Sequence, residues 1–404
     1  MDPLSILPAI AAVTAAIATA YLIAWLVGPP SDQGRFTSID GLRGYLAFFV
    51  FLHHSSIWYF YLRSDQWKVP PSNLYTHFGQ SSVAIFFMIT GFLFFSKLID
   101  GRRRDLDWGK LFVSRFMRLV PLYLFAMFLL FFVVGLLSHG LFNEPATHLV
   151  KCAIKWLGFT VLGSPNLNGI NHTSIIVAGV TWSLPYEWLF YFSLPLLAIF
   201  VGLKPPPVYL AFGLVCVVLM ASTWHPGLHH LFSFLGGIVA SILVRSHSFR
   251  QFSAKNTSSL LVLCLIATTI IIFHSAYGII PTTLLSLAFS LIAGGNSLFG
   301  ILVNPTSRTL GEMAYSIYLL HGIILFVIFN FFIGQNEAKS YSAINHWLLI
   351  VYVTPPLILS SYCTFRLIER PAIKSTNFTV SWLRSYIGKG KRSIIGVNAE
   401  APEK

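Results

Sequence analysis

Charged residues are scarce in this chain of 404 residues. Only 10% of the residues are Asp, Glu, Lys or Arg, whereas 55% are hydrophobic, and the mean hydropathy is +0.71. Soluble domains usually carry about 25% charged residues. Long uncharged apolar runs recur from one end of the sequence to the other. These features exclude an ordinary soluble domain and predict an all-α, polytopic transmembrane helical bundle.

Cysteines and acidic residues are also few. Cys152, Cys216, Cys264 and Cys363 are scattered, and no spacing among them is typical of a disulfide framework or a metal site. Acidic residues number 14 against 27 basic ones, a formal net charge of +13. In a soluble protein this excess would favour nucleic-acid binding, but in a membrane protein it reflects basic cytoplasmic loops. We therefore expect neither a nucleic-acid partner nor a bound metal.

The apolar runs predict about eleven membrane spans. The first run could be a signal peptide, because it contains small residues, but it lacks a basic segment before it and is long enough to span, so a retained anchor is favoured. No internal repeat is evident. The predicted spans lie near residues 4–27, 43–62, 79–97, 114–137, 183–202, 207–224, 227–244, 258–274, 277–294, 312–333 and 346–367.

The distribution of basic residues predicts the orientation. The stretch 149–163 is apolar but short, and treating it as a loop leaves only five of the 27 basic residues on one side, namely Arg63, Lys68, Lys151, Lys155 and Lys339, with the other 22 opposite. Positive charge collects in cytoplasmic loops. The N-terminus is therefore expected outside and the C-terminus in the cytoplasm.

Three regions follow from this organisation. Residues 1–34 form an N-terminal transmembrane anchor and linker, residues 35–374 a membrane domain, and residues 375–404 a basic cytoplasmic tail that could be solvated or contact anionic lipid. The longest loop, 138–182, is polar and external, and it is large enough to be a lid or a binding rim.

The second predicted span carries ionisable groups at both ends, in the stretch IDGLRGYLAFFVFLHH. Asp40 and Arg43 lie at its cytoplasmic mouth, and His54 lies eleven residues beyond Arg43. Eleven residues are three helical turns, or about 16 Å, so His54 lies on the face of Arg43 and near the midplane, whereas His53 is turned about 100° away. Polar groups at that depth usually mark a pathway or a catalytic site. His54 is either a general base or nucleophile or a partner in a helix–helix hydrogen bond.

Three other polar groups have the same two readings, functional or structural. Arg115 and Arg118 share one helix face and suit phosphate groups, although basic flanks of a span look alike. Glu187, among aromatic residues, could orient a histidine or bind a hydroxyl, or could be an interfacial residue. Tyr318 and His321, which form a stripe with Tyr315, could act directly or pack as a network.

These stretches together resemble the acyltransferase-3 family of integral-membrane acyltransferases, of the O-antigen or polysaccharide O-acetyltransferase type. The family signature is an Arg, ten intervening residues and a His in the first core helix, after an Asp-Gly-Leu-Arg-Gly run. Arg43 and His54 match this signature, within the run that begins at Asp40, and His53 does not.

Five further stretches match family segments in order, so the resemblance covers residues from about 37 to 371. The family has ten core helices, which leaves the span 4–27 as an addition, and the chain has no room for the SGNH hydrolase-like domain of some members. The matching residues are Thr90, where Ser is usual, Arg115, Arg118, Pro121, Trp182, Ser183, Leu184, Glu187, Ser316, Tyr318, His321, Glu369, Arg370 and Pro371.

The resemblance implies an O-acyltransferase that takes an acetyl or other acyl group, not an aminoacyl group, from cytoplasmic acetyl-CoA. The implied acceptor is a hydroxyl of an extracytoplasmic glycan, free or lipid-linked, such as O-antigen of lipopolysaccharide, and the implied location is the bacterial inner membrane. Acetyl-CoA would be a substrate rather than a resident cofactor, and membrane lipids are the other expected partners.

Roles follow from the matched positions. His54 would be the general base or a transient acyl carrier, with Arg43, Asp40 and Glu187 in the catalytic group. Arg43, Arg115 and Arg118 would bind the CoA phosphates. Trp182, Ser183, Tyr318 and His321 would bind the acceptor. The rival interpretations are a transporter or flippase of lipid-linked sugars with a midplane proton relay, and a structural scaffold of glycan synthesis.

Overall fold

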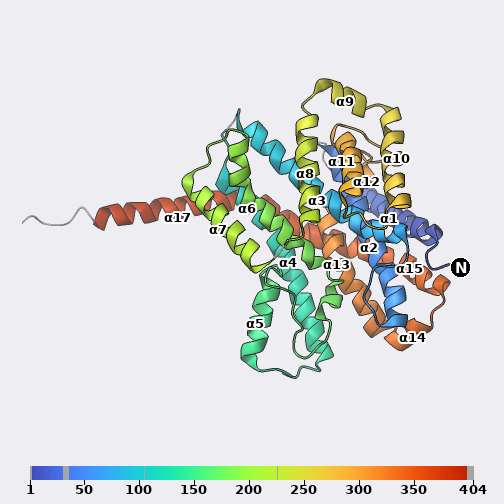
Figure 1. Cartoon of the computed structure of the whole chain (residues 1–404). Coiled ribbons are helices and arrows are strands. Elements are labelled where there is room, and N and C mark those ends of the chain that lie inside the picture. Colours follow the sequence, from blue (N-terminus) through green and yellow to red (C-terminus); the bar gives the residue numbers. More distant parts are fainter. Residues whose placement is uncertain (1, 31–35, 104, 225, 398–404) are drawn as a thin grey trace, which may run out of the picture.

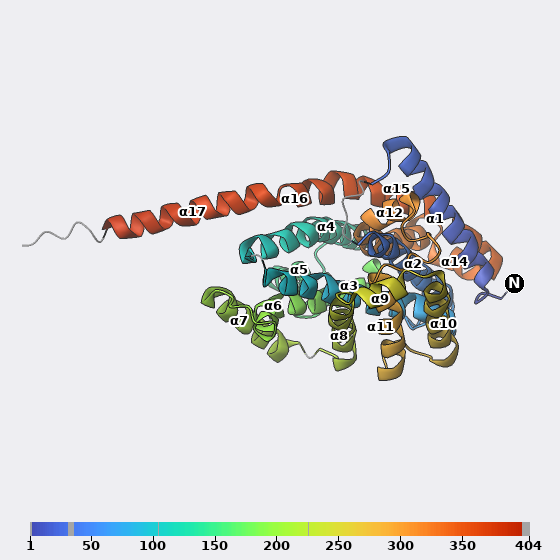
Figure 2. The same cartoon turned by 90° about the horizontal axis from the view of Figure 1, so that it is seen from above.

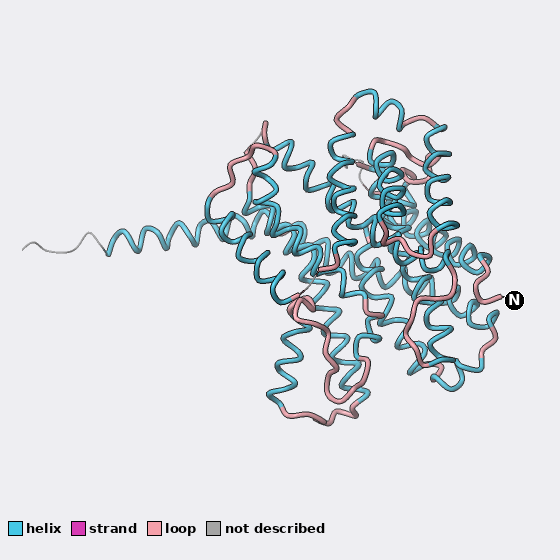
Figure 3. The backbone as a smooth tube through the Cα atoms, viewed as in Figure 1, coloured by secondary structure: helices cyan, strands magenta, loops and turns pink. Residues whose placement is uncertain are grey.

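The computed structural model describes residues 2–30, 36–103, 105–224 and 226–397, with side chains up to residue 386 in the last range. Within these ranges the chain forms helices and no strand, apart from one isolated bridge between Leu167 and Ile170. Figure 3 shows helices joined by loops of varied length. The prediction of an all-α helical bundle is confirmed.

The helices are, in chain order, α1 Ile6–Val27, α2 Thr37–Ser64, α3 Asn73–Gly101, α4 Trp108–Leu137, α5 Ala146–Leu157, the 3₁₀ helices η1 Thr173–Val177 and η2 Val180–Ser183, α6 Leu184–Phe200, α7 Pro207–Thr223, α8 Leu228–Leu243, α9 His247–Ser253, α10 Asn256–Ile272, α11 Ile279–Ala293, α12 Pro305–Glu312, α13 Ala314–Val327, the π-helix η3 Ile328–Phe332, α14 Gln335–Ser340, α15 Ala343–Thr364, the π-helix η4 Phe365–Glu369, α16 Arg370–Lys374 and α17 Thr376–Val397.

Each of the eleven predicted spans coincides with a helix, but the helices differ in length. Among the described residues, six helical segments are long and apolar enough to cross a membrane, and a seventh is added if α8 and α9, bent by 109°, form one span. Helices α7, α10 and α11 are apolar but have only 15 to 17 residues. The chain is therefore an integral membrane protein, and the number of eleven crossings stays a prediction.

Helices α2 and α3 form the centre of the bundle (Figure 1). In the most apolar 18-residue stretch of α3, 78% is buried inside the protein. Helix α2 buries His53, Ser55 and Ser56 together with its aromatic residues. Because protein rather than lipid surrounds this part of α2, its two histidines find hydrogen-bonding partners on neighbouring helices, His53 on α3 and His54 on α13. This central position is what allows a spanning helix to carry histidines.

Glycines allow α12 to pack directly on the backbone of α2. A Cβ atom at Gly41 would lie 1.9 Å from the carbonyl oxygen of Leu302, and one at Gly311 would lie 1.8 Å from that of Asp40. Small residues are what permit such a close helix crossing. The crossing sets the position of Arg43, which lies between the two α2 glycines Gly41 and Gly44.

We expect the Gly311→Ala variant to be less stable than the parent chain by about 1–3 kcal/mol, because its methyl group overlaps the α2 backbone. Thermal unfolding in detergent measures the change. Gly135→Ala, in the interior of α4, is the matched control, since a Cβ there meets nothing within 4 Å. Equal melting temperatures for the two variants would show that the crossing is not tight.

The loop 138–182, predicted to be an external lid or rim, has regular structure of its own. It contains α5, and its segment 173–183 folds back into the bundle as η1 and η2. There the carbonyl oxygen of Val180 accepts a hydrogen bond of 3.0 Å from Tyr318, and a Cβ at Gly322 would lie 2.4 Å from the backbone of Val177. Packing against α13 makes this segment part of the bundle wall, and it delivers the start of α6 to the interior.

The first and last helices of the chain differ in how they contact the bundle. Helix α1 packs on α15 through a buried alanine stripe that includes Ala12 and Ala16. Helix α17, within the predicted tail, continues the direction of α15 and α16 and projects far beyond the bundle (Figure 2). Arg384 of α17 pairs with Asp107 at 2.7 Å. Residues 398–404 of the tail lie outside the described residues.

Candidate active site

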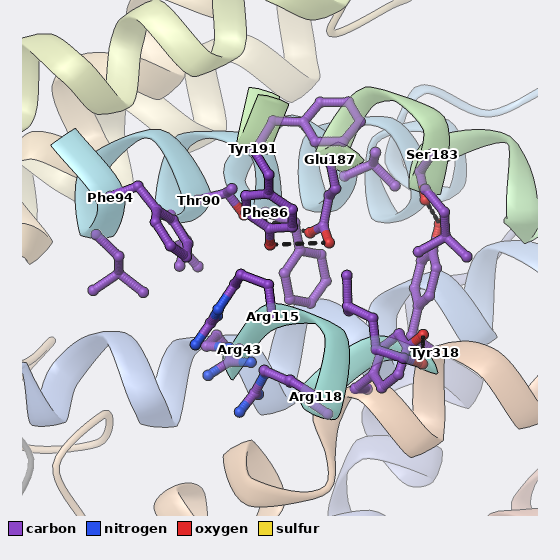
Figure 4. A pocket seen from close by; sticks show the side chains of 18 residues that line it. Arg43, Phe86, Thr90, Phe94, Arg115, Arg118, Ser183, Glu187, Tyr191 and Tyr318 are labelled. Carbon is purple, nitrogen blue, oxygen red and sulfur yellow. Dashed lines mark hydrogen bonds between the residues drawn. The ribbon is translucent and has the colours of Figure 1, made fainter. Parts of the chain in front are cut away.

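Three arginines and one glutamate line an internal cavity of about 200 Å³. Arg43 comes from α2, Arg115 and Arg118 from successive turns of α4, and Glu187 from the first turn of α6. Figure 4 shows the arginines on one wall of this inner cavity and Glu187 on the other. Three guanidinium groups against one carboxylate leave the cavity positive, and a positive cavity within a bundle favours an anionic ligand.

The inner cavity also contains apolar side chains that hold the arginines in place. The guanidinium carbon of Arg115 lies 4.8 Å from the ring centre of Phe94, and its buried Nε has no hydrogen-bond partner among the described residues. On α2, Arg43 Nη1 lies 4.0 Å from Asp40 Oδ1. A buried donor without a partner is costly, so Arg115 is arranged to receive an acceptor atom from a ligand.

Glu187 receives two long hydrogen bonds from neighbouring helices. The Thr90 hydroxyl donates to Oε1 and the Tyr191 hydroxyl donates to Oε2, each at 3.4 Å. Glu187, predicted to belong to the catalytic group, lies in the same cavity as the arginines, because η2 carries the start of α6 into the bundle.

A second, more basic pocket of about 290 Å³ adjoins the inner cavity. Its basic residues are Arg43, Arg118, Arg308, Arg370 and Lys374, against the acidic Asp40 and Glu312. Arg43 and Arg118 line both spaces. The basic pocket therefore lies at the end of the bundle that the sequence assigns to the cytoplasm, and two of its arginines reach into the interior. A polyphosphate group fits such a set of forked donors.

The structure joins His54 to His321, which the sequence had placed on separate helices. His54 Nδ1 lies 3.0 Å from His321 Nε2 and 3.0 Å from the carbonyl oxygen of Val50. His321 Nδ1 lies 3.0 Å from the carbonyl oxygen of Ile317. The ring of His54 stacks on Trp67, with centres 6.2 Å apart and planes at 16°.

These contacts determine the tautomers if both rings are neutral. Carbonyl oxygens only accept, so His321 donates from Nδ1 to Ile317, and its Nε2 is left as an acceptor. His54 then carries its proton on Nδ1 and shares it between the carbonyl oxygen of Val50 and that nitrogen. The bare lone pair of His54 is on Nε2, which has no hydrogen-bond partner among the described residues. His321 thus orients His54 with a basic nitrogen available for chemistry, as the third member of a catalytic triad does.

Tyr318 connects the histidine pair to the inner cavity. Its ring centre lies 6.3 Å from that of His321, one turn along α13. Its hydroxyl is 2.8 Å from the Ser183 hydroxyl, and both residues line the cavity. Two predicted acceptor-binding residues therefore meet at the inner cavity, whereas His54 and His321 are not among its lining residues. Trp182, the adjacent residue, instead points outward and is 38% exposed.

His53 belongs to a different environment, as its helix phase predicts. Its Nδ1 lies 2.7 Å from the carbonyl oxygen of Tyr75. Its ring packs so closely on Gly79 that a Cβ there would lie 2.5 Å from the ring. His53 is a buried residue that does not line the inner cavity, although its ring meets that of His54 edge to face, with centres 4.9 Å apart.

Sequence reasoning missed several residues of the site. Nothing in the sequence beyond residue type indicated four of them, because a separate element carries each to the site. These are Tyr191, Trp67, Arg308 and Lys374. The closing Glu-Arg-Pro run did signal Glu369, which accepts a hydrogen bond of 2.5 Å from Ser316 and is 1% exposed. Among the described residues, no group of three or more His, Cys, Asp or Glu side chains could hold a metal ion.

Comparison with known proteins gives one match. The family model described as an acyltransferase domain matches residues 36–366, which is most of the chain and includes every residue of the inner cavity. No curated protein and no solved structure shows significant similarity to the chain.

Proposed function

Because the chain belongs to this acyltransferase family and is an integral membrane acyltransferase, we propose that it moves an acetyl group from cytoplasmic acetyl-CoA to a hydroxyl of an extracytoplasmic glycan. The observation that carries the proposal is that Arg43 and Arg118 line both the basic pocket and the inner cavity. One ligand can thus place its phosphates in the first space and its acyl end in the second.

The basic pocket supports the donor part of this proposal. CoA carries several phosphate charges on a long flexible chain, and forked guanidinium donors bind phosphate oxygens strongly. Arg308, Arg370 and Lys374 add positive charge to the lining of the pocket. The Nε of Arg115, which lacks a partner, would donate a hydrogen bond to an oxygen atom of acetyl-CoA, such as that of its thioester.

His54 supports the chemical part. In the reaction, His54 Nε2 takes the proton of the acceptor hydroxyl as the oxygen attacks the thioester carbonyl. The carbon–sulfur bond then breaks, and the thiolate of CoA leaves and recovers a proton from the imidazolium. In the covalent variant, Nε2 attacks the thioester carbonyl first, and the carbon–sulfur bond breaks with loss of the CoA thiolate. The acceptor oxygen then takes the acetyl group from Nε2, and its proton goes to the thiolate. His321 serves both variants, because its Nε2 contacts the Nδ1 of His54 and orients that ring.

The orientation of the protein in the membrane belongs to the same proposal. The Arg43 end would face the cytoplasm of a bacterial inner membrane, with the N-terminus outside and the C-terminus inside. The acceptor would then reach Ser183 and Tyr318 from the opposite end, through the segment 173–183. Glycans of the O-antigen type, free or lipid-linked, are the acceptor class that this arrangement suits.

The test compares cells that express the chain with cells that carry the empty vector. We expect alkali-labile acetyl esters on the surface polysaccharide only in the expressing cells. Membranes from the same cells should release free CoA from acetyl-CoA, measured with a thiol reagent. CoA release without polysaccharide ester would be consistent with an acyltransferase but would contradict the proposal that a glycan is the acceptor. The absence of both would overturn the proposal.

A further inference from the structure

A cluster of aromatic and imidazole rings lies beside the inner cavity, in contact with Phe87 of the cavity wall. Trp182 comes from η2, Tyr186 from α6, His229 and His230 from the start of α8, and Tyr277 from the loop before α11. The ring of His230 lies at its centre, 4.8 Å from Trp182, 4.9 Å from Tyr186 and 4.3 Å from Tyr277. We call these five residues the ring cluster.

The ring cluster is held by backbone contacts between its elements. Gly227 N donates a hydrogen bond of 2.9 Å to the Tyr186 hydroxyl, which fixes the start of α8 on α6. Gln80 of α3 accepts hydrogen bonds of 2.7 Å from Ser275 and 3.0 Å from Ala276, next to Tyr277. Helix α8 lies against α3 so closely that a Cβ at Gly237 would lie 2.0 Å from the carbonyl oxygen of Met88. The rings are thus preorganised.

His230 carries an unmet hydrogen-bonding group. Its Nε2 shares a bond of 3.0 Å with His229 Nε2. Its Nδ1 is buried and has no partner among the described residues, and the residue is only 9% exposed. A neutral imidazole has one donor and one acceptor nitrogen, so Nδ1 lacks either an acceptor or a donor. A hydroxyl group satisfies both cases, because it donates and accepts.

The ring cluster is reachable from outside and continuous with the reaction path. Trp182 is 38% exposed, and His229 is exposed beside it. Phe87 lines the inner cavity, and its ring centre lies 6.3 Å from both Trp182 and His230. A ligand that rests on Trp182 is therefore separated from the inner cavity by one phenyl ring.

We propose that the ring cluster is a subsite for one pyranose ring of the acceptor. A pyranose has apolar C–H faces, which stack on an indole, and a rim of hydroxyls, which pair with imidazole and phenol groups. Trp182 takes the face of the sugar, and His230 and Tyr277 take its hydroxyls. The proposal rests on the proposed function and deepens it, since it assigns the sugar specificity to residues outside the Arg43–His54 signature.

Binding of simple sugars tests this subsite without acyl-CoA. The probes are the methyl pyranosides of glucose, galactose, mannose and rhamnose, added to the full chain in detergent and observed by saturation-transfer NMR. We expect transfer to the ring protons of at least one probe with the parent chain. Trp182→Ala and His230→Phe, which keeps a ring but removes both nitrogens, should weaken that binding about tenfold, the effect of one lost aromatic or polar contact.

Trp25→Ala is the matched control, because Trp25 lies on α1 with 71% exposure. It should bind the probes as the parent does. Transfer from no probe, or equal transfer in Trp182→Ala and Trp25→Ala, would overturn the subsite. Sugar binding in a preparation that forms no ester would support the subsite and contradict the acyl-transfer proposal, so failure of one is distinguishable from failure of the other.

Discussion

The His54→Ala variant is expected to transfer acetyl groups about 10²–10⁴ times more slowly than the parent chain, the usual contribution of a positioned general base. The reason is that Nε2 of His54 is the basic nitrogen left open by the hydrogen bond from His54 Nδ1 to His321. The measurement is kcat for CoA release in the presence of acceptor, per mole of folded protein in detergent.

His53→Ala is the matched control for this prediction, since His53 is the neighbouring histidine on the same helix. It loses a buried hydrogen bond to Tyr75 and leaves a cavity, so its melting temperature should fall while its kcat is kept. Equal kcat values for His54→Ala and the parent chain would contradict the role of His54.

The same experiment separates the two forms of the mechanism. If His54 carries the acetyl group, acid quenching of a single turnover with radiolabelled acetyl-CoA should leave label on the parent chain and none on His54→Ala. If His54 is a general base, no label is expected, and added imidazole should restore part of the activity of His54→Ala. His321→Ala should lower kcat less than His54→Ala, because it removes orientation and leaves the base.

The Arg43→Lys variant is expected to raise KM for acetyl-CoA about 10- to 100-fold. Arg43 lies on the wall between the basic pocket and the inner cavity, where a planar fork can contact two oxygens at once. Lysine keeps the charge but loses the second contact, and a hydrogen bond to a charged group is worth about 1.5–3 kcal/mol. Initial rates of CoA release at varied acetyl-CoA give KM and kcat separately.

Arg103→Lys is the control for Arg43→Lys, because Arg103 is an exposed arginine in the loop after α3. It should leave both constants unchanged. An unchanged KM in Arg43→Lys would show that acetyl-CoA does not contact Arg43. It would also weaken the observation on which the proposed function depends.

These measurements also bear on the rival interpretations. A transporter or flippase with a proton relay would not release CoA in proportion to an acceptor, and a scaffold would tolerate both His54→Ala and Arg43→Lys. The His54–His321 pair alone would suit a relay. The basic pocket, which shares Arg43 and Arg118 with the inner cavity, favours a phosphate-bearing donor, which neither rival requires.

Much of the fold followed from local sequence. The apolar runs indicated eleven of the helices, because a membrane requires backbone groups to be satisfied within one segment. The short or polar helices, such as α5 and α12, were not predicted. The spacing of Arg43 and His54 placed both on one face of α2, and His53 on another, through the helical repeat alone. The glycines at 41 and 44 mark the α12 crossing, but a glycine in a helix does not say which backbone approaches it.

What the sequence by itself determined about this protein is its class: a polytopic helical membrane protein, its family signature and the residue types of the site. Only the tertiary structure decided that His321 orients His54 and that Glu187 faces Arg43. Only the fold-back of the segment 173–183 carries α6 to that depth. The physical reason is that hydropathy and helical periodicity describe one helix at a time, whereas the contacts of the site join helices that are far apart in the chain.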